Sequence, residues 1–593
     1  MGKKNFKNNL SDPKQKESLR RSISLLKPQK LQVILSLVLA IISVGMSLAA
    51  PIVCGKAIDK MTGAGVDTGA VMTLAGIFLA LIGINAVSQM GMSLVNNKIT
   101  YSVTKKLRID LFGHIQELPI QYMDSNATGA TLNRMIADVD QLSDGLLLGF
   151  SKLFSSAVMI VATIVIMFIL SWQIAIVVVV LTPLSLFVAK YISKQTFTMF
   201  KAQSDIRGEM TTIIDDMIGN QKIVQAFNHQ DYVVDQFQEV NVRLRDVSQK
   251  AVFASSLTNP STRFVNGLVY AGVAIVGCVI AIHSPSAMTI GLLSAFLSYA
   301  NQYTKPFNDI SSVITEIQNA LACASRVFEL MDEEEQSDDS RSLRLGHAAN
   351  GNIEFRHVYF SYIPMLPFME NISFKVFPGQ RVAIVGPTGC GKTTLINLLM
   401  RFYDVDSGTI AVDAMPVQEM VRNSLRECFG MVLQETWLKN ATVFENIAYG
   451  KPNATFEEVR EAAMEVHADS FIQRLPNGYD TVIGEDGGIL SQGQKQLICI
   501  ARVMLTKPPM LILDEATSSI DTRTEMKIQD AFAKLMRGRT SIIVAHRLST
   551  IKNCDLILVM DEGRIVEAGT HDALLAYGGV YTELYNSQFA YDT

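Results

Sequence analysis

Six long apolar windows in the N-terminal half limit the folds open to this chain more than any other feature. Each is charge-free and about 17–25 residues long, the length that a helix needs to cross about 30 Å of hydrocarbon. A hydrophobic share of 49% and a charged share of 18% agree with membrane-spanning helices. Buried helices of a large soluble core are the alternative, which six windows in one half disfavour. The windows are 31–54, 69–89, 154–170, 172–189, 264–282 and 288–304.

Lysine and arginine placement predicts the orientation of these spans. Two long segments, between the second and third windows and between the fourth and fifth, are basic, whereas the first loop on the other side carries only Lys56 and Lys60. We expect both long segments to lie in the cytoplasm as helical extensions of the spans. Their basic residues are Lys98, Lys105, Lys106, Arg108 and Arg134, then Lys194, Lys201, Arg207, Lys222, Arg243, Arg245 and Lys250.

The residues ahead of the first window are polar and basic, with no apolar core of a signal peptide. Arg20, Arg21, Lys27 and Lys30 fit a helix lying on the anionic inner leaflet of a membrane. A solvated basic tail is the alternative, and the sequence leaves both open.

The second half carries a phosphate-binding motif and a carboxylate strand. GPTGCGKT at 386–393 fits G-x-x-x-x-G-K-[ST] between a strand-like and a helix-like run. Its backbone N–H groups and helix N-terminus suit phosphate, with Lys392 reaching the β- and γ-phosphates and Thr393 reaching Mg²⁺. LILDE at 511–515 ends in Asp514, placed to hold the metal's water shell, and Glu515, placed to polarise an attacking water. A chance glycine-rich loop is the alternative; together, the two motifs predict binding and hydrolysis of ATP.

Charge and cysteine content exclude other classes. The net charge of −4 gives no reason to expect a nucleic-acid partner. The seven cysteines are scattered without metal-ligand spacing or a disulfide framework. Cys390 lies inside the phosphate motif, either as a plain spacer or as a point of sensitivity to thiol reagents.

From about residue 18 to 588, the chain resembles ATP-binding cassette (ABC) exporter half-transporters. The most specific element is LSQGQ at 490–494, which is similar to the family signature LSGGQ. The resemblance implies an α-helical six-span membrane domain fused to an α/β P-loop nucleotide-binding domain. It divides the chain into an N-terminal cytoplasmic or interfacial helix, a transmembrane domain, a linker and the nucleotide-binding domain. These are residues 1–28, 29–325, 326–350 and 351–593.

The resemblance also implies roles for individual residues, with ATP and Mg²⁺ as ligands. The catalytic set is Glu515, His546, Gln434 and Lys392, and the metal is held by Thr393, Gln434 and Asp514. Tyr362 corresponds to the aromatic residue that stacks on adenine, although a tyrosine there could also be core. The remaining nucleotide-binding residues are Gly386, Gly389, Gly391, Lys392, Thr393 and Thr394 in the phosphate motif, Ser491, Gly493 and Gln494 in the signature, and Asp521.

Two cytoplasmic segments, 122–138 and 218–228, resemble the short coupling helices that press on the nucleotide domains in this family. One departure is Gln492, where the signature usually has glycine. An intact catalytic set beside an altered signature resembles one half of heterodimeric multidrug exporters, whose partner has a degenerate catalytic site. A substitution tolerated in a homodimer is the alternative.

The resulting prediction is ATP-driven export of amphipathic small molecules, of the multidrug type, across the cytoplasmic membrane. The chain would span that membrane several times, with its N-terminus and ATPase in the cytoplasm and a second half-transporter as partner. A peptide or lipid exporter of the same architecture, possibly homodimeric, is the competing interpretation. A non-transport ABC ATPase acting on ribosomes or DNA is excluded by the predicted spans.

Overall fold

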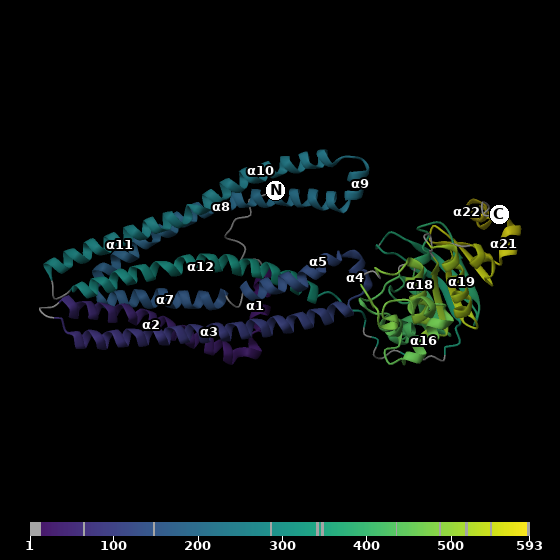
Figure 1. Cartoon of the computed structure of the whole chain (residues 1–593), viewed down its shortest axis with the longest axis horizontal. Coiled ribbons are helices and arrows are strands. Elements are labelled where there is room, and N and C mark those ends of the chain that lie inside the picture. Colours follow the sequence, from purple (N-terminus) through teal and green to yellow (C-terminus); the bar gives the residue numbers. More distant parts are fainter. Residues whose placement is uncertain are drawn as a thin grey trace. The chain divides into compact units, whose positions relative to one another are not determined.

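The computed structural model describes residues 13–62, 66–145, 149–284, 288–337, 339, 343–344, 349–363, 365–433, 436–484, 488–515, 520–545 and 548–589. The chain divides into two compact units (Figure 1). The first consists of Met1–Gln116 and Ala127–Glu333, and the second of Glu117–Asn126 and Glu334–Thr593.

The first unit is helical throughout its described part. Four of its helices are long and apolar enough to cross a membrane: Lys27–Thr62, Thr68–Glu117, Ser151–Leu170 and Arg263–His283. The two remaining predicted windows, 172–189 and 288–304, lie largely within α8 and α12. The helices are α1 (Pro13–Ser24), η2 (Lys27–Gln29), α2 (Lys30–Thr62), α3 (Thr68–Glu117), α5 (Thr128–Asn133), η3 (Arg134–Asp138), α6 (Val139–Ser143), α7 (Gly149–Leu170), α8 (Trp172–Gly219), α9 (Gln221–Ala226), α10 (Gln230–Ser256), α11 (Thr258–His283) and α12 (Ile290–Met331).

Helix α12 is central to the packing of this unit, because it contacts α2, α7 and α11. Its Phe296 and Tyr299 are fully buried with Leu48 of α2, Met167 of α7 and Val273 of α11. The Tyr299 hydroxyl donates a hydrogen bond to the backbone carbonyl of Leu48. Tyr299 is therefore a packing residue in this conformation.

The crossing of α2 and α12 depends on two glycines. A Cβ atom on Gly291 would lie 1.9 Å from the carbonyl oxygen of Gly55, and one on Gly55 would lie 2.5 Å from the carbonyl oxygen of Gly291. Small residues allow close backbone approach between membrane helices. Asp59 secures the same crossing by accepting hydrogen bonds from the Thr289 hydroxyl and the Gly291 N–H.

The long segments that the sequence predicts to be cytoplasmic form helical extensions, as expected. Helices α8 and α10 run side by side, and α9 connects them at one end (Figure 1). Helix α9 has no buried residue, and Ile223 on it is 57% exposed. The other segment folds back through η3, where the buried carboxylate of Asp138 forms a bidentate ion pair with Arg326 of α12, at 2.6 and 2.7 Å.

The described part of the second unit contains three sheets. A six-stranded sheet has the order β12-β11-β3-β10-β9-β6, a four-stranded sheet the order β2-β1-β4-β5, and β7 pairs with β8. The strands are β1 (Ile353–Phe360), β2 (Met369–Val376), β3 (Arg381–Val385), β4 (Ser407–Val412), β5 (Met415–Pro416), β6 (Phe429–Val432), β7 (Ala441–Thr442), β8 (Val482–Ile483), β9 (Met510–Glu515), β10 (Thr540–Ala545), β11 (Leu556–Asp561) and β12 (Arg564–Gly569). The longer helices are α13 (Lys392–Leu399), α16 (Phe456–Glu465), α18 (Gln492–Thr506), α19 (Thr522–Met536) and α22 (Val580–Phe589). Shorter ones are α4 (Ile120–Ser125), α14 (Arg422–Glu427), α15 (Val443–Ile447), α17 (Asp469–Ile472), α20 (Leu548–Lys552), α21 (His571–Tyr577), and the 3₁₀ turns Val417–Glu419, Ala448–Gly450 and Gly478–Asp480.

The six-stranded sheet has an apolar core on each face. Consecutive side chains of a strand point to opposite faces, so one strand contributes to both cores. On β9, Leu511 and Leu513 belong to one apolar core, whereas Met510 and Ile512 belong to the other. Continuous apolar runs are typical of parallel strands covered on both faces. The strand-like run before the phosphate motif is β3, and the carboxylate strand predicted at 511–515 is confirmed as β9.

Candidate functional site

The strand order of the six-stranded sheet brings the two sequence motifs to one edge. Strand β10 lies between β3 and β9 and is parallel to both. The carboxyl ends of parallel strands meet at the same edge, where α/β proteins bind ligands. Gly386 follows β3 there, and Asp514 and Glu515 end β9. Ala545 ends β10 directly before His546, which lies outside the described residues.

The phosphate motif folds as a loop between β3 and α13. Gly391 has φ +106° and caps α13, a conformation that suits glycine. A Cβ atom on Gly386 would lie 2.2 Å from the carbonyl oxygen of Met560. Lys392 is only 8% exposed. Its ammonium donates hydrogen bonds to the carbonyl oxygens of Gly386 and Pro387, both at 2.9 Å. The loop is thus built tightly around its lysine.

The rest of the motif agrees with a phosphate cradle. Gly389 has φ +87° and is exposed, as is Thr393 in the first turn of α13. Thr394 is buried. Cys390 is also buried, in an apolar core, which supports the interpretation of this residue as a spacer. Backbone N–H groups at a helix N-terminus bind anions, so the loop's donor set fits a polyphosphate.

Tyr362 is attached to the phosphate loop. Its hydroxyl lies 2.9 Å from Oγ1 of Thr394. Its half-buried ring contacts Phe360, Phe368 and Tyr403 edge-on. Tyr362 also lines a cavity of ≈ 760 Å³ beside α4. The ring is therefore both part of an aromatic cluster and accessible at a surface.

The two acids of the carboxylate strand both pair with β10. Asp514 is 9% exposed and pairs in register with Val544 of β10. Glu515 pairs with Ala545 in the same ladder, and only its backbone is described. Gln434, predicted as a catalytic and metal-binding residue, lies outside the described residues.

The signature forms the N-terminus of α18. The Ser491 hydroxyl accepts from the Gln494 N–H at 3.4 Å, and the Gln494 side chain accepts from the Ser491 N–H at 2.9 Å, which is a capping box. A Cβ atom on Gly493 would lie 2.4 Å from Cγ2 of Thr524, so the helix needs glycine there. The side chain of the exposed Gln492 is held by a hydrogen bond from its Nε2 to Oγ1 of Thr436, at 3.2 Å.

Asp521 caps the helix that follows the carboxylate strand. Its Oδ1 accepts from the Thr524 N–H at 3.0 Å. This backbone hydrogen bond lowers the pKa of Asp521, because it favours the charged form. The residue has a structural role at the start of α19 whatever it contributes to nucleotide binding.

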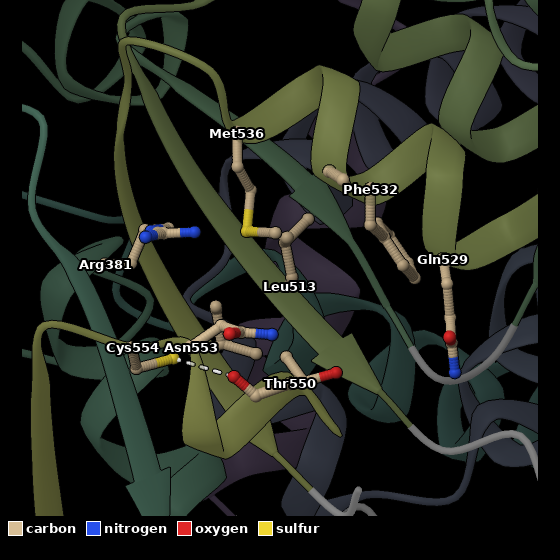
Figure 2. Close-up of a pocket in the computed structure, with 10 residues that line it drawn as sticks. Arg381, Leu513, Gln529, Phe532, Met536, Thr550, Asn553 and Cys554 are labelled. Atoms are coloured by element: carbon tan, nitrogen blue, oxygen red, sulfur yellow. Dashed lines mark hydrogen bonds between the residues drawn. The ribbon is translucent and has the colours of Figure 1, made fainter. Parts of the chain in front are cut away.

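A separate cavity of ≈ 250 Å³ lies beneath α19 and α20 (Figure 2). Leu513, Phe532 and Met536 form apolar walls, and Arg381 and Gln529 add polar groups. None of the predicted site residues lines it, so we do not assign it to the nucleotide.

The structure adds a contact that motif spacing did not suggest. Tyr403, buried after α13, donates a hydrogen bond from its hydroxyl to the carboxylate of Asp124 on α4. Burial raises the pKa of Tyr403, and the hydrogen bond to Asp124 adds to the shift. Asp124 lies in the first predicted coupling segment, but the sequence gives no signal for a partner 279 residues away.

Two residues of the predicted linker also make contacts that the sequence did not predict. The guanidinium of Arg422 donates to the backbone and side-chain oxygens of Ser337, and its backbone N–H donates to Asp339 at 2.6 Å. Burial lowers the pKa of Arg422. Part of the predicted 326–350 linker is thus bound to the second unit.

Comparison with known proteins agrees with this geometry. Residues 33–307 match the family model described as the ABC transporter transmembrane region, and residues 369–518 match the one described as ABC transporter. The chain belongs to the ABC exporters. Its transmembrane and ATP-binding domains are fused in one polypeptide, and the predicted fold class is confirmed. ATP binding, and hydrolysis of ATP coupled to transport across a membrane, follow from membership of this family.

Several relatives are similar over most of their length. The fatty acid ABC transporter ATP-binding/permease protein of Mycobacterium bovis is 40% identical over 526 residues, covering 89% of this chain and 83% of that protein. The ATP-dependent lipid A-core flippase of Escherichia coli K12 is 36% identical over 508 residues, covering 85% of each. A solved bacterial Atm1-family ABC exporter with ATP bound superposes with a TM-score of 0.77 at 28% identity, covering 94% of this chain and 98% of that one.

Proposed function

We propose that this ABC exporter moves amphipathic molecules out of the cytoplasm across the cytoplasmic membrane. The observation that carries the proposal is the absence of charged residues from all six apolar windows, together with basic residues at their cytoplasmic ends. A strongly charged hydrophilic solute would find no counter-ion within these windows. An amphipathic molecule can place its apolar part between the helices and its polar part at the interface.

Two substrate classes remain in competition. Export of the multidrug type is the prediction from the family resemblance, and export of a peptide or a lipid is the alternative. Two relatives are named for fatty acids and for lipid A-core. Their names raise the weight of the lipid alternative to that of the multidrug type. Both classes share an apolar body and a polar end, so the same spans suit either.

We assign the phosphate loop to the ATP phosphates. Lys392 would exchange its bonds to the Gly386 and Pro387 carbonyls for the β- and γ-phosphates. Gly386, Gly389, Gly391 and Thr394 would complete the cradle. Tyr362, attached through Thr394, would offer its ring to adenine.

We assign the chemistry to the carboxyl edge of the sheet. Glu515 would accept the proton of the attacking water, with His546 and Gln434 near the γ-phosphate. Thr393, Gln434 and Asp514 would hold Mg²⁺, which when bound neutralises charge on the phosphates. Asp521 would meet the nucleotide from the start of α19.

Transport further requires a second half-transporter. Ser491, Gly493 and Gln494 would cover the ATP of the partner chain, since an exposed helix N-terminus attracts phosphate. Gln492 favours a different chain with a degenerate catalytic site as partner, and homodimerisation remains the alternative. The exposed helix α9 is the second coupling helix in this proposal, and α4 the first.

Transport by purified protein in proteoliposomes tests the proposal. ATP-dependent accumulation is measured for a fluorescent fatty acid, a fluorescent phospholipid, a cationic amphipathic dye and a hydrophilic peptide, with Glu515→Gln protein as the matched control. Accumulation of the dye alone assigns the multidrug type, and of the lipids alone the lipid type. Accumulation of only the hydrophilic peptide contradicts the amphipathic assignment.

A further inference from the structure

The strongest feature outside the nucleotide site is a pocket at the N-terminal end of the first unit. It has a volume of ≈ 320 Å³, at the lower end of the range of about 300–1,000 Å³ typical of ligand sites. Helices α1, α2, α3 and α7 and the turn after α1 form it together. Its lining includes Ile23, Leu26, Leu37, Ile99 and Phe154.

The polar atoms in this lining bind one another. The Ser36 hydroxyl donates to Oδ1 of Asn96 at 2.6 Å, and Nδ2 of Asn96 donates to the Ser151 hydroxyl at 2.9 Å. This bridge ties α2, α3 and α7 together. Because these groups satisfy each other, the remaining walls favour an apolar occupant.

The position of the pocket along α2 places it within one leaflet of a bilayer. Ser36 follows Lys30 by six residues, which is about 9 Å along a helix. Lys30 begins α2, and the apolar window starts directly after it. If the N-terminus is cytoplasmic, as proposed above, the pocket lies where the acyl chains of the inner leaflet meet their headgroups.

Charge around the pocket favours an anionic headgroup. Arg20, Lys27 and Lys30 are exposed and lie within three residues of the lining residues Ile23, Leu26 and Val33. Arg21 is already paired with Asp332. The segment 13–30 has one acid, Glu17, against the bases Lys14, Lys16, Arg20, Arg21, Lys27 and Lys30. Basic segments next to a membrane attract anionic lipid.

Two amide oxygens add a requirement for hydrogen-bond donors. Oε1 of Gln29 and Oε1 of Gln32 are buried and have no hydrogen-bond partner within the described part of the chain. Gln32 on α2 lies four residues before the lining residue Ser36, and Gln29 at the end of η2 lies four residues before the lining residue Val33, which is about one helical turn in each case. A buried acceptor without a partner is unfavourable, so a donor from the occupant would be stabilising.

We propose that this pocket is a binding site for an anionic phospholipid with headgroup hydroxyls, drawn from the inner leaflet. One acyl chain fills the apolar walls, the phosphate meets Lys27 and Lys30, and headgroup hydroxyls donate to Gln29 and Gln32. Phosphatidylglycerol has this chemistry, whereas phosphatidylcholine has neither net charge nor a hydroxyl donor. The lipid is a structural ligand of the exporter in this proposal, distinct from its transported substrate.

Photolabelling of the full-length protein in nanodiscs tests the site. The probe is phosphatidylglycerol with a diazirine on one acyl chain, and labelled peptides are mapped by mass spectrometry. We expect saturable labelling of peptides that contain Leu37, Ile99 and Phe154, removed by excess unlabelled phosphatidylglycerol and not by phosphatidylcholine. Labelling that both lipids compete equally, as for ordinary boundary lipid, overturns the proposal.

Paired variants locate the labelling. Leu37→Trp fills the pocket and should reduce labelling by about tenfold, while Leu31→Trp, on the 82% exposed side chain of Leu31, should not. Lys27→Gln with Lys30→Gln should weaken phosphatidylglycerol binding, whereas Lys56→Gln with Lys60→Gln should not. Stronger labelling by a diazirine fatty acid than by the phospholipid contradicts the assignment. ATP hydrolysis is measured in parallel, so that loss of labelling with retained activity counts against this site and not against export.

Discussion

Tyr403 holds Asp124 through a hydrogen bond from its buried phenol, and this contact attaches α4 to the nucleotide-binding unit. The polypeptide enters α4 from α3 and leaves it into α5, and both of those helices belong largely to the membrane unit. A displacement of α4 would therefore be passed along the polypeptide to α3 on one side and to α5 on the other.

Tyr403→Phe removes this hydrogen bond without changing the ring. We expect basal ATP hydrolysis to persist and its stimulation by transported substrate to fall by about fivefold, the equivalent of one hydrogen bond of about 1 kcal/mol. Tyr577→Phe is the matched control, because Tyr577 is 74% exposed in the same unit. ATPase assays with and without substrate measure the effect. Equal stimulation in wild type and Tyr403→Phe would show that α4 does not depend on this contact.

Glu515→Gln tests the proposed catalytic base. We expect hydrolysis to fall by about 10²–10⁴-fold while ATP still binds, because the amide cannot accept the proton of the water. Lys392→Ala should instead weaken ATP binding itself. Glu461→Gln, an exposed acid on α16, is the control. Hydrolysis near the wild-type rate in Glu515→Gln would exclude this residue as the base.

Arg326→Ala tests the ion pair that joins α12 to η3. The Asp138 carboxylate, 5% exposed, would lose its guanidinium partner, whereas Arg326 itself is 46% exposed. We expect a loss of about 2 kcal/mol, below the cost for a fully buried pair because water reaches the arginine. Thermal denaturation of the detergent-solubilised protein measures it, with Arg245→Ala as the exposed control. A midpoint like that of the control would mean that the pair contributes little.

The pH dependence of the same pair has a definite sign. The hydrogen bond to Asp138 raises the pKa of Arg326 above its ordinary value. A raised pKa of a base gives stability that is present below the unfolded-state pKa and is lost only as the pH rises through the folded-state value. We therefore expect the difference between wild type and Arg326→Ala to stay constant from about pH 7 to about pH 9, well below any arginine pKa.

Gly291→Ala tests the crossing of α2 and α12. Its methyl group would overlap the carbonyl oxygen of Gly55, so the two helices must separate, at a cost of about 1–3 kcal/mol. Gly45→Ala is the control, because a Cβ atom there meets nothing within 4 Å. The two variants are compared by thermal denaturation. Equal midpoints would show that α12 can shift without loss.

The sequence predicted the local elements of the nucleotide unit better than their assembly. Charge-free apolar runs and a glycine-rich motif identify β3, β9 and the loop before α13, because these signals lie within a few residues. The position of β10 between β3 and β9 could not be predicted, since β3 lies more than a hundred residues before β10 and no local pattern encodes their pairing. The hydrogen bond from Tyr403 to Asp124 and the pocket beside α1 likewise depend on long-range packing.

Gln492 permits a test of whether the two ATP sites of the dimer are equivalent. Its side chain is bound to Thr436 and leaves Ser491 exposed at the N-terminus of α18, so a glutamine here is compatible with a working signature as well as with an impaired one. If the partner is a different chain with a weak catalytic site, Glu515→Gln in this chain should stop almost all hydrolysis by the pair. The matching change in the partner should do little, and Gln492→Gly should raise turnover at most modestly, because the partner's own site still limits the rate. Co-purification of both half-transporters followed by ATPase assays of each variant pair gives the answer. If this chain alone forms a dimer whose full activity is stimulated by transported substrate, the sites are equivalent and the exporter is a homodimer.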